Sequence, residues 1–224
     1  MTVVHHVPPV PVYLEIGAKR VFACALDWPG WCRSGRGEAQ ALEALAAAAP
    51  RYASVAVAAG LSFPERAAFE VVERVRGSAA TDFGVPEKAA SSDDAPLSRE
   101  EAERLAALVA AAWRVFDAVV ATAPPELRKG PRGGGRDRDA IVAHVLGAEA
   151  AYARQMGIRP REPAAGDRAA VAALRAAIVD ALRAAADPPA DRWRWPPRYA
   201  ARRIAWHVLD HAWAIEDRSR PAPV

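Results

Sequence analysis

The sequence is poor in cysteine, in long apolar runs and in clustered charge, and each shortage excludes a class of protein. Its two cysteines, Cys24 and Cys32, are too few for a disulfide scaffold, and their spacing matches no common metal motif. We expect reduced, partly buried thiols. No apolar run approaches the roughly 20 residues of a membrane span, and the first residues lack the basic and apolar regions of a signal peptide. The sequence therefore predicts a cytoplasmic protein without a membrane partner.

Neither sign of charge gathers in one part of the chain. Lys and Arg number 30 against 27 Asp and Glu, and arginine alternates with aspartate at residues 136–139. Proteins that bind nucleic acid usually collect their basic excess on one stripe, whereas alternating charges are typical of a solvated surface. Nucleic acid is therefore not expected as a partner. Hydrophobic residues make up 52% of the chain, enough for a real core.

Residues 1–80 have the periodicities of a small α+β domain, with an antiparallel sheet and helices. Alternating apolar residues predict a hairpin over residues 10–27 and a third strand at 69–75. Between them, apolar residues spaced three and four apart predict one helix that ends at Pro50 and a second that ends at Gly60.

The composition changes after this unit. Residues 81–97 are rich in Ser, Asp, Ala and Pro, and we interpret them as a linker between two separable domains. From there on the apolar period is helical, which predicts an all-α four-helix bundle over residues 98–218 and a short tail at 219–224. The capping box of Ser98 and Glu101 marks the start of the bundle.

Three of the five histidines fall in the predicted bundle. His207 and His211 are four residues apart, so they project from one face of the last helix. His144 lies among apolar residues of the second helix and is expected to point inward. Three neutral imidazoles suit Zn²⁺, and also Ni²⁺ or Fe²⁺. The alternative is three buried histidines, each with a backbone partner.

The fourth position of such a site is expected to stay open. The carboxylates nearest to the histidines in sequence are Glu149 and Asp210. Asp210 directly precedes His211, which turns it about 100° away around the helix, and Glu149 is turned off the face of His144. The remaining position would fall to water or to a thiol.

The sequence around these histidines resembles the DinB/YfiT-like superfamily of helix bundles, which includes the mycothiol-dependent maleylpyruvate isomerases. The similarity is carried by residues 138–149, RDAIVAHVLGAE, and by residues 206–211, WHVLDH, and it covers roughly residues 98–218. The resemblance implies a divalent metal on His144, His207 and His211. It also implies the activity of a thiol-dependent transferase or isomerase.

The N-terminal unit is similar to the HicB-like antitoxin fold. The similar segments are residues 13–15, residues 25–32 and the helix that begins near residue 38. HicB proteins usually carry a DNA-binding segment after this unit, but here the predicted bundle takes that place. The resemblance leaves a rival to the enzyme: a protein-binding or regulatory module, in which the bundle is a metal-stabilised dimerisation body. A bundle without metal is a third alternative.

For the enzyme, the expected chemistry is activation of a low-molecular-weight thiol or of water. A divalent cation stabilises thiolate or hydroxide at neutral pH, and a small-molecule electrophile would react in a pocket between the helices. The side chains expected around this pocket are Trp113, Asp117, Tyr152, Trp206 and Asp210. Ordinary core packing is the alternative for the aromatic residues, and an exposed surface carboxylate is the alternative for Asp210. Arg202 and Arg203 could attract an anionic substrate.

Overall fold

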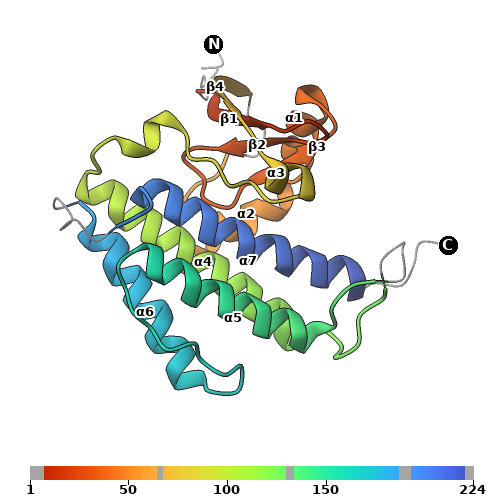
Figure 1. Ribbon diagram of the computed structural model, residues 1–224, viewed down its shortest axis with the longest axis vertical. Helices are drawn as coiled ribbons and strands as arrows, with labels where there is room; N and C mark the ends of the chain where they lie inside the picture. Colours follow the sequence, from red (N-terminus) through yellow and green to blue (C-terminus); the bar gives the residue numbers. More distant parts are fainter. Residues whose placement is uncertain (1–7, 65–67, 130–133, 187–192, 220–224) are drawn as a thin grey trace, which may run out of the picture.

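The computed structural model describes residues 8–64, 68–129, 134–186 and 193–219 (Figure 1). A small mixed sheet with short helices forms the N-terminal part, and four long helices lie below it in the view of Figure 1. The α+β class predicted from the sequence is confirmed.

The sheet has the strand order β3-β2-β1-β4. Its strands are β1 (Val10–Ile16), β2 (Val21–Ala25), β3 (Cys32–Gly35) and β4 (Phe69–Arg76). The hairpin of β1 and β2 was predicted, but β4 pairs with β1 in parallel, so the prediction of a wholly antiparallel sheet is wrong. The chain leaves β3, passes through two helices and returns beside β1 in the same direction, and such a crossover gives a parallel neighbour. β3 was not predicted, because its sequence CRSG lacks alternating apolar residues.

Two helices follow the hairpin, α1 (Glu38–Ala47) and α2 (Ala49–Ala58). α1 packs against β2 and β3, and buried Leu45 and Tyr52 join the core of the sheet. Pro50 was predicted to end the first helix, whereas it lies in the first turn of α2. Proline is tolerated there because the first turn of a helix needs no intrahelical N–H donors.

The segment interpreted as a linker is held on two sides. It contains the end of α3 (Ala79–Phe83) and the short 3₁₀ helix η1 (Ser91–Asp94). Buried Glu15 of β1 accepts hydrogen bonds from the backbone N–H groups of Glu87 and Lys88, at 3.2 and 2.9 Å. Asp93 forms a buried ion pair with Arg202 in the last helix. The segment is therefore fixed more firmly than its composition predicted.

The four long helices fill the range predicted for them, residues 98–218, and the last one ends one residue beyond it. They are α4 (Arg99–Thr122), α5 (Arg138–Gln155), α6 (Arg168–Ala184) and α7 (Pro197–Ser219). α4 and α5 each pack against both α6 and α7. The predicted capping box opens α4: the N–H of Glu101 donates to the Ser98 hydroxyl at 3.1 Å, and the Ser98 N–H donates to the Glu101 carboxylate at 2.8 Å.

By length and composition alone, α4 could cross a membrane. Its large apolar side chains, including Leu108, Val109 and Phe116, are however buried against other parts of the chain. The central helix of a packed core has the same composition as a membrane span, so packing accounts for the apolar character of α4.

The sheet and the long helices share one continuous apolar core. Gly30, in the turn between β2 and β3, lies against α7 with φ of +92°, and a Cβ at this position would lie 2.6 Å from Leu209 Cδ1. Glycine permits both the backbone conformation and the close approach. On α7, the Trp213 ring also stacks under the Arg33 guanidinium at 3.8 Å. Helix α7 therefore helps to join the two parts, together with α4, which packs against α2.

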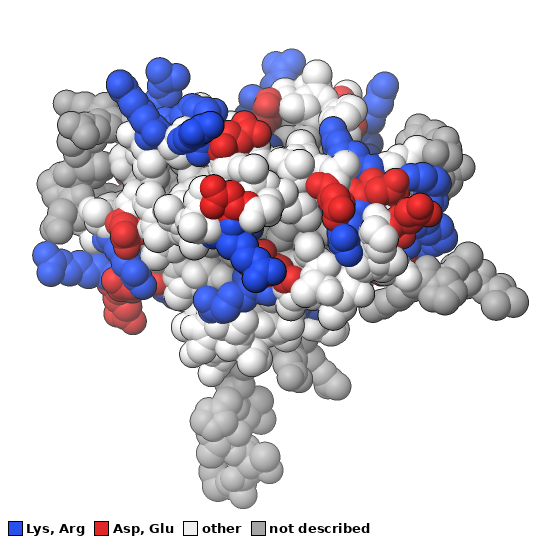
Figure 2. All heavy atoms as spheres, turned by 90° about the horizontal axis from the view of Figure 1, so that it is seen from below, with Lys and Arg blue, Asp and Glu red and all other residues white. Residues whose placement is uncertain are grey.

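The charges seen from below are mixed in sign. Figure 2 shows basic and acidic side chains interspersed on this face, with white surface between them. This face has the mixed pattern that the sequence predicted.

Candidate metal centre

The three histidines of the long helices, His144, His207 and His211, come together between α5 and α7. Their ligand nitrogens all lie within 4.8 Å of one another, and His144 Nε2 is 3.2 Å from His207 Nε2. Zinc–nitrogen bonds of about 2.0–2.1 Å put the nitrogens of a tetrahedral site about 3.3 Å apart. Small side-chain rotations would therefore bring His211 into the same coordination sphere.

The helices explain this convergence. His207 and His211 are one turn apart on α7, and their rings lie with centroids 4.6 Å apart. α5 packs against α7 and directs His144 at both rings, with centroid distances of 5.1 and 5.0 Å. His207 is buried at 7% exposure, whereas His144 and His211 are half-buried. The cluster therefore has one deep member and two that border the surface.

The surroundings keep the imidazoles neutral. Burial, followed by the charges of His211 and Arg203, lowers the pKa of His207 to about 2. Burial and His144 lower the pKa of His211 to about 4, and burial with Arg136 also lowers the pKa of His144. A histidine binds a metal through a neutral ring. All three rings are in this form at neutral pH.

No described carboxylate or cysteine joins the three imidazoles in this cluster. Asp210, expected around the pocket, has its Oδ1 atom 3.5 Å from Nη1 of Arg33 on β3. Buried His207 Nδ1 has no hydrogen-bond partner within the described part of the chain. Metal-bound histidines usually donate through the second nitrogen. The three imidazoles thus fit a divalent metal, but no described residue accepts a hydrogen bond from Nδ1 of His207.

Aromatic residues and one arginine border the cluster on one side. The Tyr152 ring lies 5.6 Å from His207, and the Trp206 ring lies 6.2 Å from it. The Arg203 guanidinium lies over both aromatic rings, at 5.2 and 4.7 Å, and its buried Nη1 has no hydrogen-bond partner among the described residues. Two of the residues expected around the pocket, Tyr152 and Trp206, are therefore next to the histidines.

The other two expected residues, Trp113 and Asp117, belong to a different cluster. Arg175 of α6 donates to the Asp117 carboxylate at 3.0 and 2.8 Å and lies 5.2 Å from the Trp113 ring centroid. The same guanidinium pairs with buried Glu149 of α5. In the described part of the chain, no hydrogen bond or ring contact joins Trp113 or Asp117 to the histidines. The sequence placed both residues on α4 correctly, but it did not show which neighbours they face.

One aromatic residue near the histidines and one nearby charge were not predicted from the sequence. The ring centroid of Trp195 lies 5.2 Å from that of Tyr152 and 5.1 Å from that of Tyr199. Trp195 and Tyr199 therefore extend the group of aromatic rings that begins with Tyr152 beside His207. The signal was the concentration of aromatic residues at 193–199, just before and within the start of α7. Arg136 was interpreted as part of a self-compensated surface, yet its charge lowers the pKa of His144 and His211.

Comparisons of the chain with protein-family models, with curated proteins and with solved structures find no match. The chemistry of the three histidines is therefore argued from their geometry and surroundings.

Proposed function

We propose that the chain is a metal-dependent enzyme of the DinB/YfiT-like type, in which the four long helices form the bundle. His144, His207 and His211 hold a divalent ion, zinc first, with nickel or iron as alternatives. The reaction is an S-transfer or isomerisation of a small-molecule electrophile that uses a low-molecular-weight thiol. The observation that carries this proposal is the convergence of three neutral imidazoles, from two helices, within 4.8 Å.

The positive charge around the histidines favours anionic ligands beside a bound cation. Three lone pairs converge where the described residues supply no acid to share with them. The guanidinium of Arg203 and the charge of Arg136 lie close enough to lower the pKa of His207. A cation in this setting is stabilised by negatively charged partners. A thiolate and an anionic group of the electrophile would provide this compensation.

The aromatic residues and the arginine near the histidines have separate roles in this proposal. When bound, the divalent cation would lower the pKa of a thiol or of water and make it a nucleophile. Tyr152 and Trp195 exclude water from one side, since their rings lie 5.2 Å apart beside His207. Arg203 orients an anionic group, because its buried Nη1 is free to donate in the described structure. Exclusion of water strengthens both electrostatic interactions.

Metal content tests the site. Protein purified without a histidine tag is expected to contain about one divalent metal per chain by elemental analysis. A His207→Ala/His211→Ala variant should lose it, because a single imidazole is left. The matched control is His5→Ala/His6→Ala, which also removes two histidines and should keep the metal. Wild-type protein that stays metal-free after incubation with zinc, nickel and iron salts would contradict the proposal.

A cobalt-substituted protein tests whether the site can do chemistry. Millimolar 2-mercaptoethanol should change its visible spectrum, because the three histidines leave a position for a thiol. The same amount of ethylene glycol, which lacks the sulfur, should leave the spectrum unchanged. A spectrum that does not respond to thiol would indicate a closed, structural site. The bundle would then be a metal-stabilised body for the HicB-like module.

A further inference from the structure

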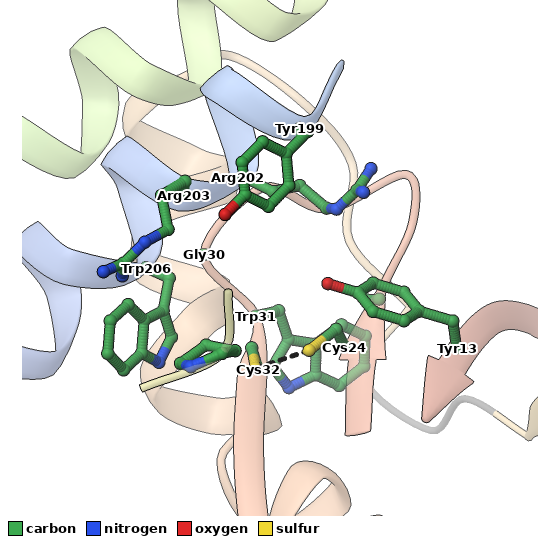
Figure 3. A pocket seen from close by; sticks show the side chains of 11 residues that line it. Tyr13, Cys24, Gly30, Trp31, Cys32, Tyr199, Arg202, Arg203 and Trp206 are labelled. Atoms are coloured by element: carbon green, nitrogen blue, oxygen red, sulfur yellow. Dashed lines mark hydrogen bonds between the residues drawn. The ribbon is translucent and has the colours of Figure 1, made fainter. Parts of the chain in front are cut away.

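The two cysteines form a pair between neighbouring strands. Cys24 of β2 and Cys32 of β3 are directly opposite in the antiparallel register, and their sulfur atoms lie 2.7 Å apart. Both side chains are buried, at 3% and 5% exposure. Figure 3 shows the two sulfur atoms pointing toward each other below Tyr199 and Arg202. The sequence predicted partly buried thiols, but their contact depends on the register of β3.

The backbone around the pair suits a disulfide. The N–H of Ala25 donates to the Trp31 carbonyl at 3.0 Å, and this pair is the next one along the ladder. Cys24 and Cys32 therefore occupy a non-hydrogen-bonded position, where opposing Cα atoms come to about 4.5 Å. Disulfides span Cα separations of about 4.4–6.8 Å. The strands already hold the two residues at a bonding separation.

A small cavity borders both sulfur-bearing residues. Its volume is about 20 Å³, and its wall includes Tyr13, Trp31, Tyr199 and Trp206. A space of this size holds about one water molecule. Burial, followed by the hydrogen bond with Cys24, raises the pKa of the Cys32 thiol. Burial of both side chains limits the access of bulky reagents to the sulfur atoms, whereas an oxidant near the size of water fits the cavity.

We propose that Cys24 and Cys32 are a redox pair, which hydrogen peroxide closes into a disulfide between β2 and β3. In the first step, one sulfur attacks a peroxide oxygen: an S–O bond forms, the O–O bond breaks, and the leaving hydroxide takes the thiol proton to become water. In the second step, the other sulfur attacks the sulfenic acid: the S–S bond forms, the S–O bond breaks, and a second water leaves. Two thiols lose two electrons and two protons, and one peroxide becomes two waters.

The position of the pair gives the bond a structural consequence. Trp31 and Gly30 directly precede Cys32, and Gly30 touches α7 at Leu209. Trp206 of α7 packs in the same apolar cluster as both cysteines. A bond between Cys24 and Cys32 would therefore fix both ends of the turn between β2 and β3, the turn that lies against α7. The disulfide involves neither a predicted metal ligand nor a thiol cosubstrate. The proposal of a redox pair therefore does not rest on the proposed enzyme activity.

The chain offers a direct assay for this bond. Trypsin cuts after Arg20 and Arg33, so both cysteines fall in one peptide, residues 21–33. Folded protein is treated with millimolar peroxide, then denatured, alkylated with iodoacetamide and digested without reductant. We expect the peptide to carry no alkyl group and to weigh two hydrogen atoms less than the reduced form. Dithiothreitol before alkylation should restore two alkyl groups.

Single-cysteine variants supply the control. Cys24→Ala and Cys32→Ala each retain one thiol, so peroxide cannot give the peptide that has lost two hydrogens. Full alkylation of both wild-type cysteines after peroxide treatment would overturn the proposal. A linkage between two chains, or separate oxidation of each cysteine to a sulfinic acid, would overturn it as well. The decisive measurement is made on the wild type, so it stands even where a variant folds poorly.

Discussion

Two polar clusters meet on helix α5, and they differ in how their charges are satisfied. One consists of Glu149 with Arg175, whose guanidinium donates to both carboxylate oxygens at 3.1 and 3.2 Å. The other consists of His144, His207 and His211, three bases without an acid among the described residues. Buried Glu149 has a partner in the Arg175 guanidinium, which also pairs with exposed Asp117. Unmatched donors or acceptors in a native structure, by contrast, need an explanation. The comparison therefore favours the histidines as the place that would accept a ligand.

The pKa shifts show the same difference. Burial raises the pKa of Glu149, and the charge and hydrogen bonds of Arg175 act in the opposite direction. For His207, burial and the positive charges of Arg203 and Arg136 all lower the pKa together. The neighbour thus compensates part of the burial of the carboxylate, whose pKa stays raised, while the imidazole has no compensating charge. Such one-sided perturbation is typical of functional sites.

The largest expected effect comes from breaking the satisfied cluster. Arg175→Ala leaves fully buried Glu149 without its partner, and removal of one member of a buried ion pair costs about 3–5 kcal/mol. Chemical denaturation at neutral pH should show this loss in the free energy of unfolding. In metal-free protein, His207→Ala should cost less, because it removes no charge partner.

A control for this comparison lies on α6, the helix that carries Arg175. Arg183 pairs with Glu103, and both side chains are at least half exposed. Exposed pairs contribute about 0–1 kcal/mol, so Arg183→Ala should be mild. An Arg175→Ala variant as stable as Arg183→Ala would mean that Glu149 is not held as an ion pair, and the contrast between the two clusters would fail.

The comparison also explains what the sequence could predict. His207 and His211 are four apart on one helix, so their common face follows from helical geometry alone. The capping box of Ser98 and the apolar period gave the start of α4. These signals are local: each lies within a few residues of one helix.

The features that were missed depend on partners far apart in the sequence. Glu149 meets Arg175 only because α5 and α6 pack together. The contact of the cysteines requires the register of β3, a strand whose four residues show no alternation. The segment at 81–97 has a polar composition, but buried Glu15 and Arg202 use its backbone and its Asp93 as partners. Composition cannot show such partners, because they belong to other elements.

The smallest expected effect is a pH dependence that separates the two clusters. His207 and His211 have folded-state pKa values of about 2 and about 4, below the ordinary value of 6.5. As the pH falls below 6.5, the unfolded chain binds protons that the folded chain does not, so the stability of metal-free protein falls. Between pH 7 and pH 6 the two imidazoles should together cost about 1 kcal/mol.

Metal-free protein can be prepared with a chelator and unfolded in urea at pH 7 and pH 6 to measure this difference. A His207→Gln/His211→Gln variant removes both titrating rings, so its stability should change less over the same range. Arg183→Ala retains both rings and breaks only exposed ion pairs, so it should show the wild-type pH dependence. Equal pH dependence in wild type and in the double glutamine variant would mean that folding leaves the pKa values of both imidazoles unchanged. The surroundings would then not hold the two rings neutral below pH 6.5, and the electrostatic contrast between the histidines and the pair of Glu149 and Arg175 would fail.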